Sequence, residues 1–313
     1  MTTDLVAALD IGGTKIAGAL VDERGTVHAR QQVPTPPSAP GETVLAAVAD
    51  VLSRLAEDGR WSRVGALGIG SAGPVDAVSG TVGPVNIPGW RDFPLVEGVR
   101  QVVGGLPVTL VGDGVAMVAA EHAAGAAVGR RNALGMVVST GVGGGLVLDG
   151  RPLSGPTGNS GHIGHICVEL SGDECPCGGR GCVETIASGP SIVRRALARG
   201  WQPGPEEETT AAAVARAAGR GDEVAVEAFD RAGRALGAAV AAAAALVEIE
   251  VAVIGGGVAQ AGELLFAPLR ASLDLYAGLS FTHGVQVLPT RIGSDAGLVG
   301  AAAACRAELL ELP

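Results

Sequence analysis

The sequence predicts a duplicated, two-domain α/β fold. Two stretches repeat the same order of features, namely an apolar strand, a glycine turn, a second strand and an acidic turn that ends in glycine. They are residues 5–25 and residues 135–150. A chain of 313 residues is also long for one hydrophobic core, so two domains of ordinary size are expected.

The first stretch is suited to binding phosphate. The strand Leu5–Asp10 runs into the turn Gly12-Gly13-Thr14-Lys15, where backbone N–H groups can face a phosphate. Asp10, at the end of the strand, would be placed to hold Mg²⁺ through water. The alternative is a plain β-hairpin whose glycines serve only the turn.

The second stretch favours phosphate binding over a plain hairpin as the interpretation of the first. Its turn is Thr140-Gly141-Val142-Gly143-Gly144, and two such hairpins facing each other would clamp a nucleoside triphosphate from both sides. This arrangement belongs to actin-like, ribonuclease-H-like kinases, with the active site in the cleft between two domains. A further glycine run, Gly255-Gly256-Gly257, follows the strand 251–254 and offers another close approach of the backbone to a ligand.

Two other nucleotide-binding motifs are excluded. Residues 68–73 match G-x-G-x-x-G after a strand, but Pro74, Gly80 and Pro84 follow, so no helix opens there as a dinucleotide fold requires. The sequence also lacks G-x-x-x-x-G-K-[ST], so the phosphates are not held by a P-loop.

Apolar periodicity and turn residues locate the remaining elements. Helices are predicted over residues 40–58, 115–125, 206–218 and 222–246, with a C-terminal helix opened by Ser294 or Asp295. Strands are predicted over residues 64–69, 107–111, 251–254 and 286–289.

Asp113 is a candidate general base. It lies where a strand ends and a helix begins, close to the helix N-terminus. The competing interpretation is that Asp113 only caps the helix.

The segment 158–188 contains a predicted metal site. Its donors are His165, Cys175, Cys177 and Cys182, which suit a tetrahedral Cys₃His zinc site. Because the protein would fill all four positions, such a zinc is structural. The alternatives are buried thiols or disulfides, although Cys175 and Cys177 are too close for a comfortable disulfide. The other cysteines, Cys167 and Cys305, are predicted to be core residues.

Composition excludes several functional classes. The net charge of −10, with no cluster of Lys or Arg, argues against a nucleic-acid surface. The longest apolar run, Ala235–Val247, is shorter than the roughly 20 residues that cross a bilayer, so no membrane partner is expected. With no export signal at the N-terminus and few cysteines, we expect a cytoplasmic protein.

The sequence resembles the ROK family of sugar kinases and related repressors, and most closely its bacterial glucokinases. The resemblance rests on Asp10-Ile-Gly-Gly-Thr-Lys15, Thr140-Gly-Val-Gly-Gly-Gly145, Gly161-x-x-Gly-His165 and Cys175-x-Cys177-x4-Cys182-x-Glu184, and it covers nearly the whole chain. It implies ATP with Mg²⁺ as phosphoryl donor, a small-molecule sugar as acceptor and a structural Zn²⁺. We further expect a homo-oligomer, either a dimer or a tetramer.

The resemblance also implies domains and roles. A small domain would comprise residues 1–112 and 295–313, and a larger one residues 113–294 with the zinc. Asp113 would accept the proton of the sugar hydroxyl, and Gly73, Asn86, His165 and Glu184 would contact the sugar. The phosphate contacts would be Asp10, Gly12, Gly13, Thr14, Lys15, Thr140, Gly141, Gly143 and Gly144, and the adenosine side Gly255, Gly256 and Gly257. Repressors of the family carry an extra N-terminal helix-turn-helix, for which a phosphate motif at residue 10 leaves no room.

Two positions depart from the family pattern. The family usually has Asn before the catalytic Asp, where this chain has Gly112, and Glu in G-E-x-G-H, where it has His162. Both family residues hydrogen-bond pyranose hydroxyls, so Gly112 and His162 should change which sugar fits. We therefore expect phosphorylation of a hexose or modified hexose at its 6-hydroxyl. The alternatives are an aminohexose kinase of a specialised pathway, of the kanosamine type, or a catalytically impaired sugar-sensing protein.

Overall fold

The structure is a computed structural model of the chain, and it describes residues 4–84, 87–204 and 207–310. Its contacts divide the chain into two compact units. The first comprises residues 1–129, 145–161 and 291–313, and the second comprises residues 130–144 and 162–290. The helix that follows residue 112 thus falls in the first unit, whereas the sequence predicted a boundary at that residue.

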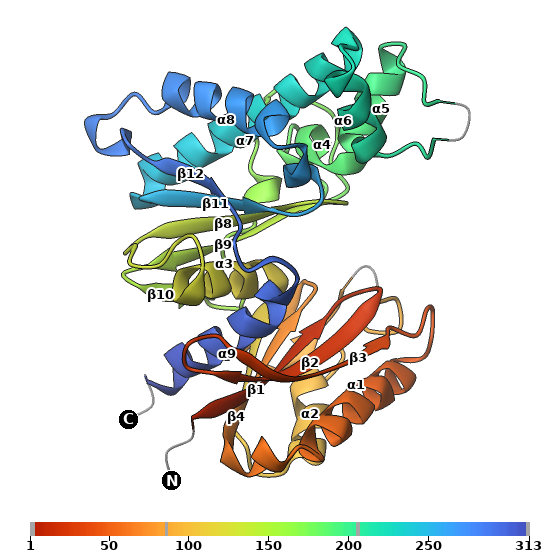
Figure 1. Cartoon of the computed structure of the whole chain (residues 1–313), viewed down its shortest axis with the longest axis vertical. Coiled ribbons are helices and arrows are strands. Elements are labelled where there is room, and N and C mark those ends of the chain that lie inside the picture. Colours follow the sequence, from red (N-terminus) through yellow and green to blue (C-terminus); the bar gives the residue numbers. More distant parts are fainter. Residues whose placement is uncertain (1–3, 85–86, 205–206, 311–313) are drawn as a thin grey trace. The chain divides into compact units, whose positions relative to one another are not determined.

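The first unit is built on a five-stranded sheet of order β3-β2-β1-β4-β7 (Figure 1). Its strands are β1 (Leu5–Ile11), β2 (Lys15–Asp22), β3 (Val27–Pro34), β4 (Val64–Ser71) and β7 (Val108–Gly112). β1 is antiparallel to β2 but parallel to β4, and β4 is parallel to β7. The carboxyl ends of β1, β4 and β7 therefore lie at one edge of the sheet.

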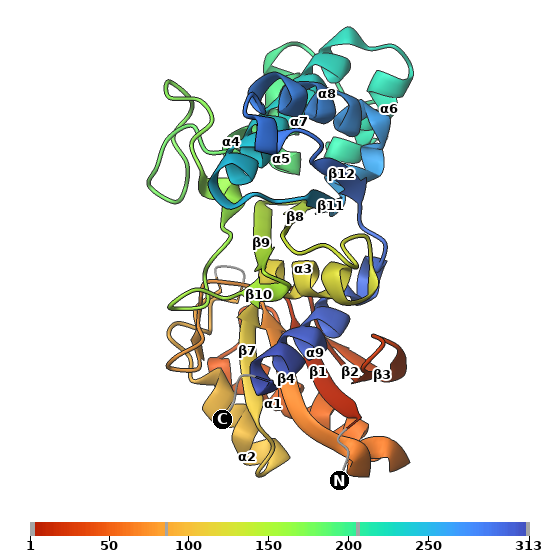
Figure 2. The same ribbon diagram turned by 90° about the vertical axis from the view of Figure 1, so that its left-hand side faces the viewer.

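Both faces of this sheet are covered, which explains why β1 is apolar except for Asp10 near its end. Side chains alternate between faces along a strand. Leu5, Leu9 and Ile11 belong to a core shared with α1 (Gly41–Ala56) and α2 (Leu95–Val103). Val6 and Ala8 belong to the opposite core, which is shared with α9 (Ala296–Leu309) (Figure 2).

Glycine and alanine let α9 approach its neighbours closely. A Cβ on Gly68 of β4 would lie 2.1 Å from the carbonyl oxygen of Ala301. A Cβ on Gly300 would lie 1.6 Å from the carbonyl oxygen of Ala116 in α3 (Asp113–Ala124). Neither distance leaves room for a side chain, so these contacts require glycine. The remaining short elements of this unit are η1 (Gly59–Arg63), β5 (Val75–Asp76), β6 (Thr81–Val82), β10 (Arg151–Leu153) and η5 (Gly293–Asp295).

The second sheet has the order β10-β9-β8-β11-β12, and β9 passes from the second unit into the first. Its longer strands are β8 (Ala133–Val138), β9 (Val142–Leu148), β11 (Val251–Gly255) and β12 (Gln286–Pro289), with β11 parallel to both β8 and β12. The helices of the second unit are α4 (Glu184–Ala187), α5 (Gly189–Ala198), α6 (Ala211–Gly219), α7 (Glu223–Val247) and α8 (Glu263–Tyr276), with the short turns η2 (Ile163–His165), η3 (Val258–Ala261) and η4 (Ser280–Thr282).

The predicted strands and most of the predicted helices are confirmed. The helix predicted from residue 206 begins only at Ala211, where the side chain of Thr210 accepts a hydrogen bond from Ala213 N–H. Cys305 is buried as expected, but the prediction for Cys167 is wrong, because this residue is exposed on the loop that carries the cysteine cluster. Within the described residues, no helix has both the length and the apolar character to cross a membrane.

Candidate active site and metal cluster

The first unit gathers several predicted site residues at one sheet edge. Ile11 pairs with Ser71 across β1 and β4, and Ser71 pairs with Gly112 across β4 and β7. Because these strands are parallel, the residues that follow them emerge at the same edge. They are the Gly12–Thr14 turn, Gly73 and Asp113.

The turn after β1 is held by its own backbone and by one threonine. Gly12 N–H donates to the carbonyl oxygen of Lys15 at 3.0 Å. The hydroxyl of Thr35 donates to the carbonyl oxygen of Gly12 at 2.6 Å, and Thr35 N–H donates to the carbonyl oxygen of Thr14 at 3.1 Å. These bonds fix the turn from the side of β3, and Thr14 remains exposed.

Asp10 experiences competing electrostatic effects. Burial raises the pKa of its carboxyl group, the positive charge of Lys15 opposes this shift, and the negative charge of Asp113 adds to it. The two carboxylates are therefore close enough to repel each other. Gly297, at the start of α9, lies directly against Asp10, because a Cβ there would be 2.4 Å from the carboxyl carbon. A pair of neighbouring carboxylates is a donor set suited to Mg²⁺.

Asp113 is exposed and begins α3, but it is not the N-cap residue. The cap position belongs to Gly112, which has no side chain to accept a hydrogen bond. The carboxylate of Asp113 instead accepts a hydrogen bond from Gly114 N–H at 2.7 Å. Helix capping therefore does not account for an aspartate at this position.

Glu121 is a buried residue of α3 to which the sequence analysis gave no role. Its side chain is 0% exposed and accepts hydrogen bonds from Ala126 N–H, Arg291 N–H and Ile292 N–H at 2.7, 2.8 and 3.0 Å. This carboxylate fixes the chain just before α9. The only signal in the sequence was a single acid inside an alanine-rich helix.

In the second unit, Glu184 is tied to the second glycine turn. Its Oε2 accepts a hydrogen bond from Val142 N–H at 2.8 Å, and a Cβ on Gly141 would lie 2.6 Å from the same oxygen. Gly164 packs against the next peptide of the turn, since a Cβ on Gly164 would lie 1.8 Å from the carbonyl oxygen of Val142. Gly164 and Glu184, which lie on either side of the cysteines in the sequence, therefore both contact the glycine turn at Val142.

The glycines after β11 border a cavity next to that turn. Gly256 has φ of +93°, and a Cβ there would lie 2.3 Å from the carbonyl oxygen of Val138. Thr140 and Gly257 both line a cavity of about 680 Å³, together with Pro190, Val193 and further residues of α5 and the start of α6. The structure thus brings the predicted phosphate turn and the predicted adenosine side to one cavity.

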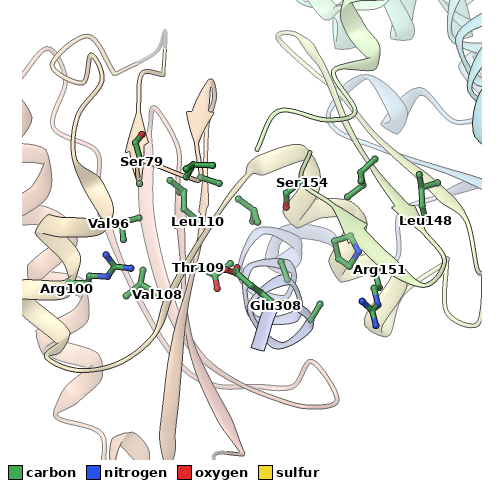
Figure 3. A pocket seen from close by; sticks show the side chains of 18 of the residues that line it. Ser79, Val96, Arg100, Val108, Thr109, Leu110, Leu148, Arg151, Ser154 and Glu308 are labelled. Carbon is green, nitrogen blue, oxygen red and sulfur yellow. The ribbon is translucent and has the colours of Figure 1, made fainter. Parts of the chain in front are cut away.

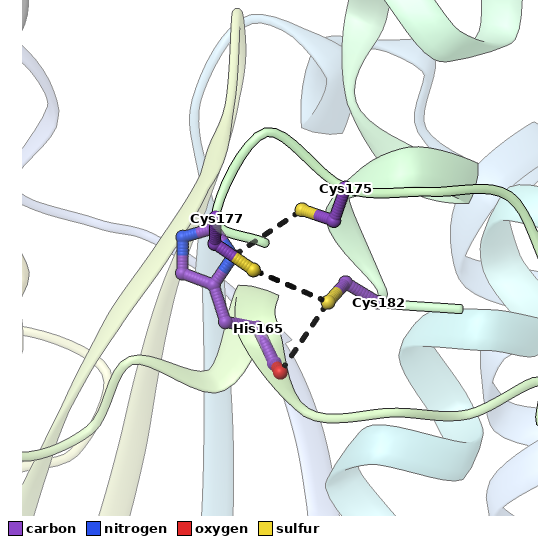
Figure 4. A group of neighbouring side chains, drawn as sticks. All are labelled: His165, Cys175, Cys177 and Cys182. Carbon is purple, nitrogen blue, oxygen red and sulfur yellow. Dashed lines mark hydrogen bonds between the residues drawn. The ribbon is translucent and has the colours of Figure 1, made fainter. Parts of the chain in front are cut away.

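The four predicted metal ligands converge (Figure 4). Their donor atoms all lie within 4.8 Å of one another, with Cys175 Sγ 3.7 Å from His165 Nδ1 and Cys177 Sγ 3.8 Å from Cys182 Sγ. Ligands about 2.3 Å from a tetrahedral zinc would be roughly 3.8 Å apart, so the spacing fits. Burial raises the pKa of Cys182 to about 12, and the neighbouring thiols of Cys175 and Cys177 act in the same direction.

The two departures from the family pattern lie in different units. Gly112 belongs to the first unit and His162 to the second. His162 is exposed, and its ring centroid lies 6.2 Å from that of His165. Asn86, which was predicted to contact the sugar, lies outside the described residues.

A larger cavity, of about 910 Å³, lies along the edge strand β7 and contains none of the predicted site residues. Figure 3 shows Arg100 and Thr109 on one side of it and Arg151 and Ser154 on the other. Its size alone therefore does not identify the active site.

Comparison with known proteins establishes the family. The model described as ROK family matches residues 6–308. The chain belongs to the ROK family. One relative is the N-acetylmannosamine kinase of Yersinia pseudotuberculosis serotype O:3, which is 36% identical over 304 residues, or 96% of this chain and 98% of that protein.

Two solved ROK structures resemble the whole chain. The ROK family glucokinase from Streptomyces griseus, in complex with glucose and AMPPNP, is 36% identical with a TM-score of 0.77, covering 96% of this chain and 99% of that one. The ROK hexokinase from Thermus thermophilus is 33% identical with a TM-score of 0.84, covering 98% of this chain and 100% of that one. The prediction of the actin-like, ribonuclease-H-like fold is therefore confirmed.

Proposed function

We propose that this ROK protein transfers the γ-phosphoryl group of ATP to the 6-hydroxyl of a hexose or modified hexose, with Asp113 as general base. The family and the relatives make the chain an ATP-dependent sugar kinase. The observation that carries the finer assignment is the position of Asp113. It is exposed at the sheet edge that also bears Asp10 and the Gly12–Thr14 turn.

The chain supplies positioning and charge for this reaction, which is what phosphoryl transfer mainly requires. The backbone of the two glycine turns, with Thr14, Lys15 and Thr140, would hold the phosphates. Gly255, Gly256 and Gly257 would lie on the adenosine side. Asp10 would hold Mg²⁺ through water, and Mg²⁺ bound with ATP neutralises phosphate charge. The carboxylate of Asp113 would accept the proton of the sugar hydroxyl while the hydroxyl oxygen bonds to the γ-phosphorus and the bond from that phosphorus to the bridging oxygen of ADP breaks, so that ADP leaves.

Replacing Asp113 tests the proton transfer. Asp113→Asn keeps the size of the side chain but removes its basicity, so turnover should fall by at least ~100-fold while AMPPNP binding stays near normal. Steady-state ADP release and calorimetric AMPPNP titration measure the two quantities. A variant that keeps most of its turnover would show that Asp113 is not the base.

The cysteine cluster is proposed to bind a structural zinc. His165, Cys175, Cys177 and Cys182 supply four protein donors with the spacing of a tetrahedral site. Metal analysis of freshly purified protein should give one zinc per chain, and absence of zinc would contradict the proposal. Reduced thiols and use of ATP fit the cytoplasm, to which we assign the protein.

The acceptor is proposed to be set by Gly112 and His162. Relatives carry the names glucokinase and N-acetylmannosamine kinase, so both unmodified and nitrogen-substituted hexoses are candidates. A panel of hexoses, aminohexoses and N-acetylated hexoses, tested with ATP and Mg²⁺, should identify one preferred acceptor by ADP release. Thermal stabilisation by a sugar without turnover would instead support a sugar-sensing protein that has lost catalysis.

A further inference from the structure

The second unit contains a small cavity rich in arginine, separate from the residues assigned to ATP. It has a volume of about 290 Å³ and lies beside α5 and α7. Four arginines line it, Arg194, Arg195, Arg199 and Arg231, but only two carboxylates, Glu169 and Asp173. The lining therefore carries two more positive than negative charges, in a chain whose net charge is −10.

Arg194 and Arg199 are each held by a partner on the protein. Arg194 donates to the carbonyl oxygen of Thr185 at 3.1 Å. Arg199 forms an ion pair with Glu227. Their guanidinium groups are thereby held at the wall of the cavity.

The other two have unused donors. Arg231 donates through Nη2 to Glu169 at 2.6 Å, but its buried Nε has no hydrogen-bond partner in the described part of the chain. Among the same residues, the side chain of half-buried Arg195 forms no hydrogen bond or ion pair. Buried donors without an acceptor are unfavourable, so this arrangement leaves hydrogen-bonding capacity for a ligand.

Electrostatics favour an anion as that ligand. Burial lowers the pKa of Arg195, and the neighbouring positive charge of Arg231 lowers it further. The negative charge of Glu169 opposes this shift, but Glu169 also forms an ion pair with Arg231. An anion between the two guanidinium groups would offset their repulsion and accept from both.

We propose that this cavity is a binding site for phosphate or for a small phosphate monoester. A tetrahedral oxyanion offers several acceptors at once and suits the fork of N–H donors of each guanidinium group. The volume is at the small end of the range of ligand pockets, which favours a phosphate or sugar phosphate over a nucleotide.

The site lies next to residues of the proposed sugar site. Thr185 and Ile186 line the cavity and directly follow Glu184. Asp173, in the loop of the metal ligands, lines it as well. An occupied site should therefore alter the KM for the sugar. This coupling rests on the proposed function, whereas anion binding itself does not.

Calorimetric titration tests the site with inorganic phosphate and, separately, with glucose 6-phosphate, in the presence of saturating AMPPNP so that the nucleotide site is filled. Wild-type protein should bind at least one of them. Arg195→Gln should weaken that binding at least tenfold, and it breaks no hydrogen bond of the described chain. Arg270→Gln, which alters an arginine of α8 paired with Glu263, is the control and should bind like wild type.

Comparing inorganic phosphate with glucose 6-phosphate distinguishes a site for free phosphate from a site for a phosphate monoester. Equal affinity would indicate that only the phosphate is recognised, and tighter glucose 6-phosphate binding would indicate a monoester site. Absence of binding by wild type, or equal binding by Arg195→Gln and wild type, would overturn the proposal. These outcomes do not depend on turnover, so they are separate from failure of the proposed kinase reaction.

Discussion

At residue 112, the backbone and its surroundings leave room for a side chain. Gly112 has φ of −68° and ψ of 154°, which any residue can adopt. Among the described residues, its two chain neighbours aside, a Cβ there would approach only the carbonyl oxygen of Gly158, at 3.8 Å, an ordinary contact distance. Glycine at this position is therefore not demanded by the fold of the first unit, which is consistent with a role in substrate choice.

Restoring the family residues tests that role. Gly112→Asn with His162→Glu should shift the ratio of kcat/KM values between glucose and the preferred acceptor towards glucose. Each regained hydrogen bond contributes about 1 kcal/mol, so the double change should shift this ratio by roughly tenfold or more. Gly112→Ala adds bulk without an amide and is the control. An unchanged sugar preference would remove both residues from the specificity determinants, and a collapse of ATP affinity would place them elsewhere.

Substitutions at two glycines of the second turn test contacts within the protein and contacts with the ligand separately. A Cβ on Gly141 would collide with Glu184, whereas a Cβ on Gly143 would meet no atom of the described residues within 4 Å, its two chain neighbours aside. Gly141→Ala should lower the melting temperature and weaken both AMPPNP and sugar binding. Gly143→Ala should leave the melting temperature unchanged and weaken only AMPPNP binding. Normal AMPPNP affinity in Gly143→Ala would argue against close approach of phosphate at that residue.

At the scale of elements, the loop of the predicted metal ligands contacts the second glycine turn. Gly164 precedes the predicted ligand His165, and Glu184 follows the predicted ligand Cys182 by two residues. Both contact Val142. Val183 N–H also donates to the carbonyl oxygen of Ile166 at 3.1 Å, and this bond joins the two segments that contact Val142. Loss of the metal should therefore loosen the phosphate turn as well as the sugar site.

A pair of exposed cysteines tests this connection. Cys177→Ser removes a ligand and should lose zinc and weaken AMPPNP binding measured without sugar. Cys167→Ser, in the same loop but outside the ligand set, should keep both. Zinc content and calorimetric titration give the two values. If Cys177→Ser loses zinc but binds AMPPNP normally, the metal does not support the turn.

Two of the helices that were not predicted from the sequence, α8 and α5, have physical explanations. α8 contains Pro268 in its interior, which ordinarily signals the end of a helix. α5 begins with Gly189-Pro190, a pair that resembles a turn, although Ser188 caps the helix and proline is well tolerated in the first turn. Strands and ligand clusters were predictable because their signals are local. The bond between Glu184 and Val142 was not, because it joins residues 42 positions apart.

At the scale of the molecule, the end of α8 suggests how chains associate. Leu275, Tyr276, Leu279 and Phe281 are all at least half exposed and lie within seven residues of one another. Concentrated apolar surface of this kind is uncommon on monomers and marks association sites. A second copy of this chain, burying the same surface on both partners, is the expected occupant.

Light scattering coupled to size exclusion should accordingly give a mass at least twice the 30.9 kDa of one chain. Phe281→Glu with Leu279→Glu should shift the protein towards monomer, because a buried carboxylate without a partner is unfavourable at a symmetric interface. Val78→Glu changes an even more exposed apolar residue of the first unit and should leave the mass unchanged. A wild-type protein of single-chain mass would refute the expected homo-oligomer, and an oligomer unaffected by the double variant would place its interface on another surface.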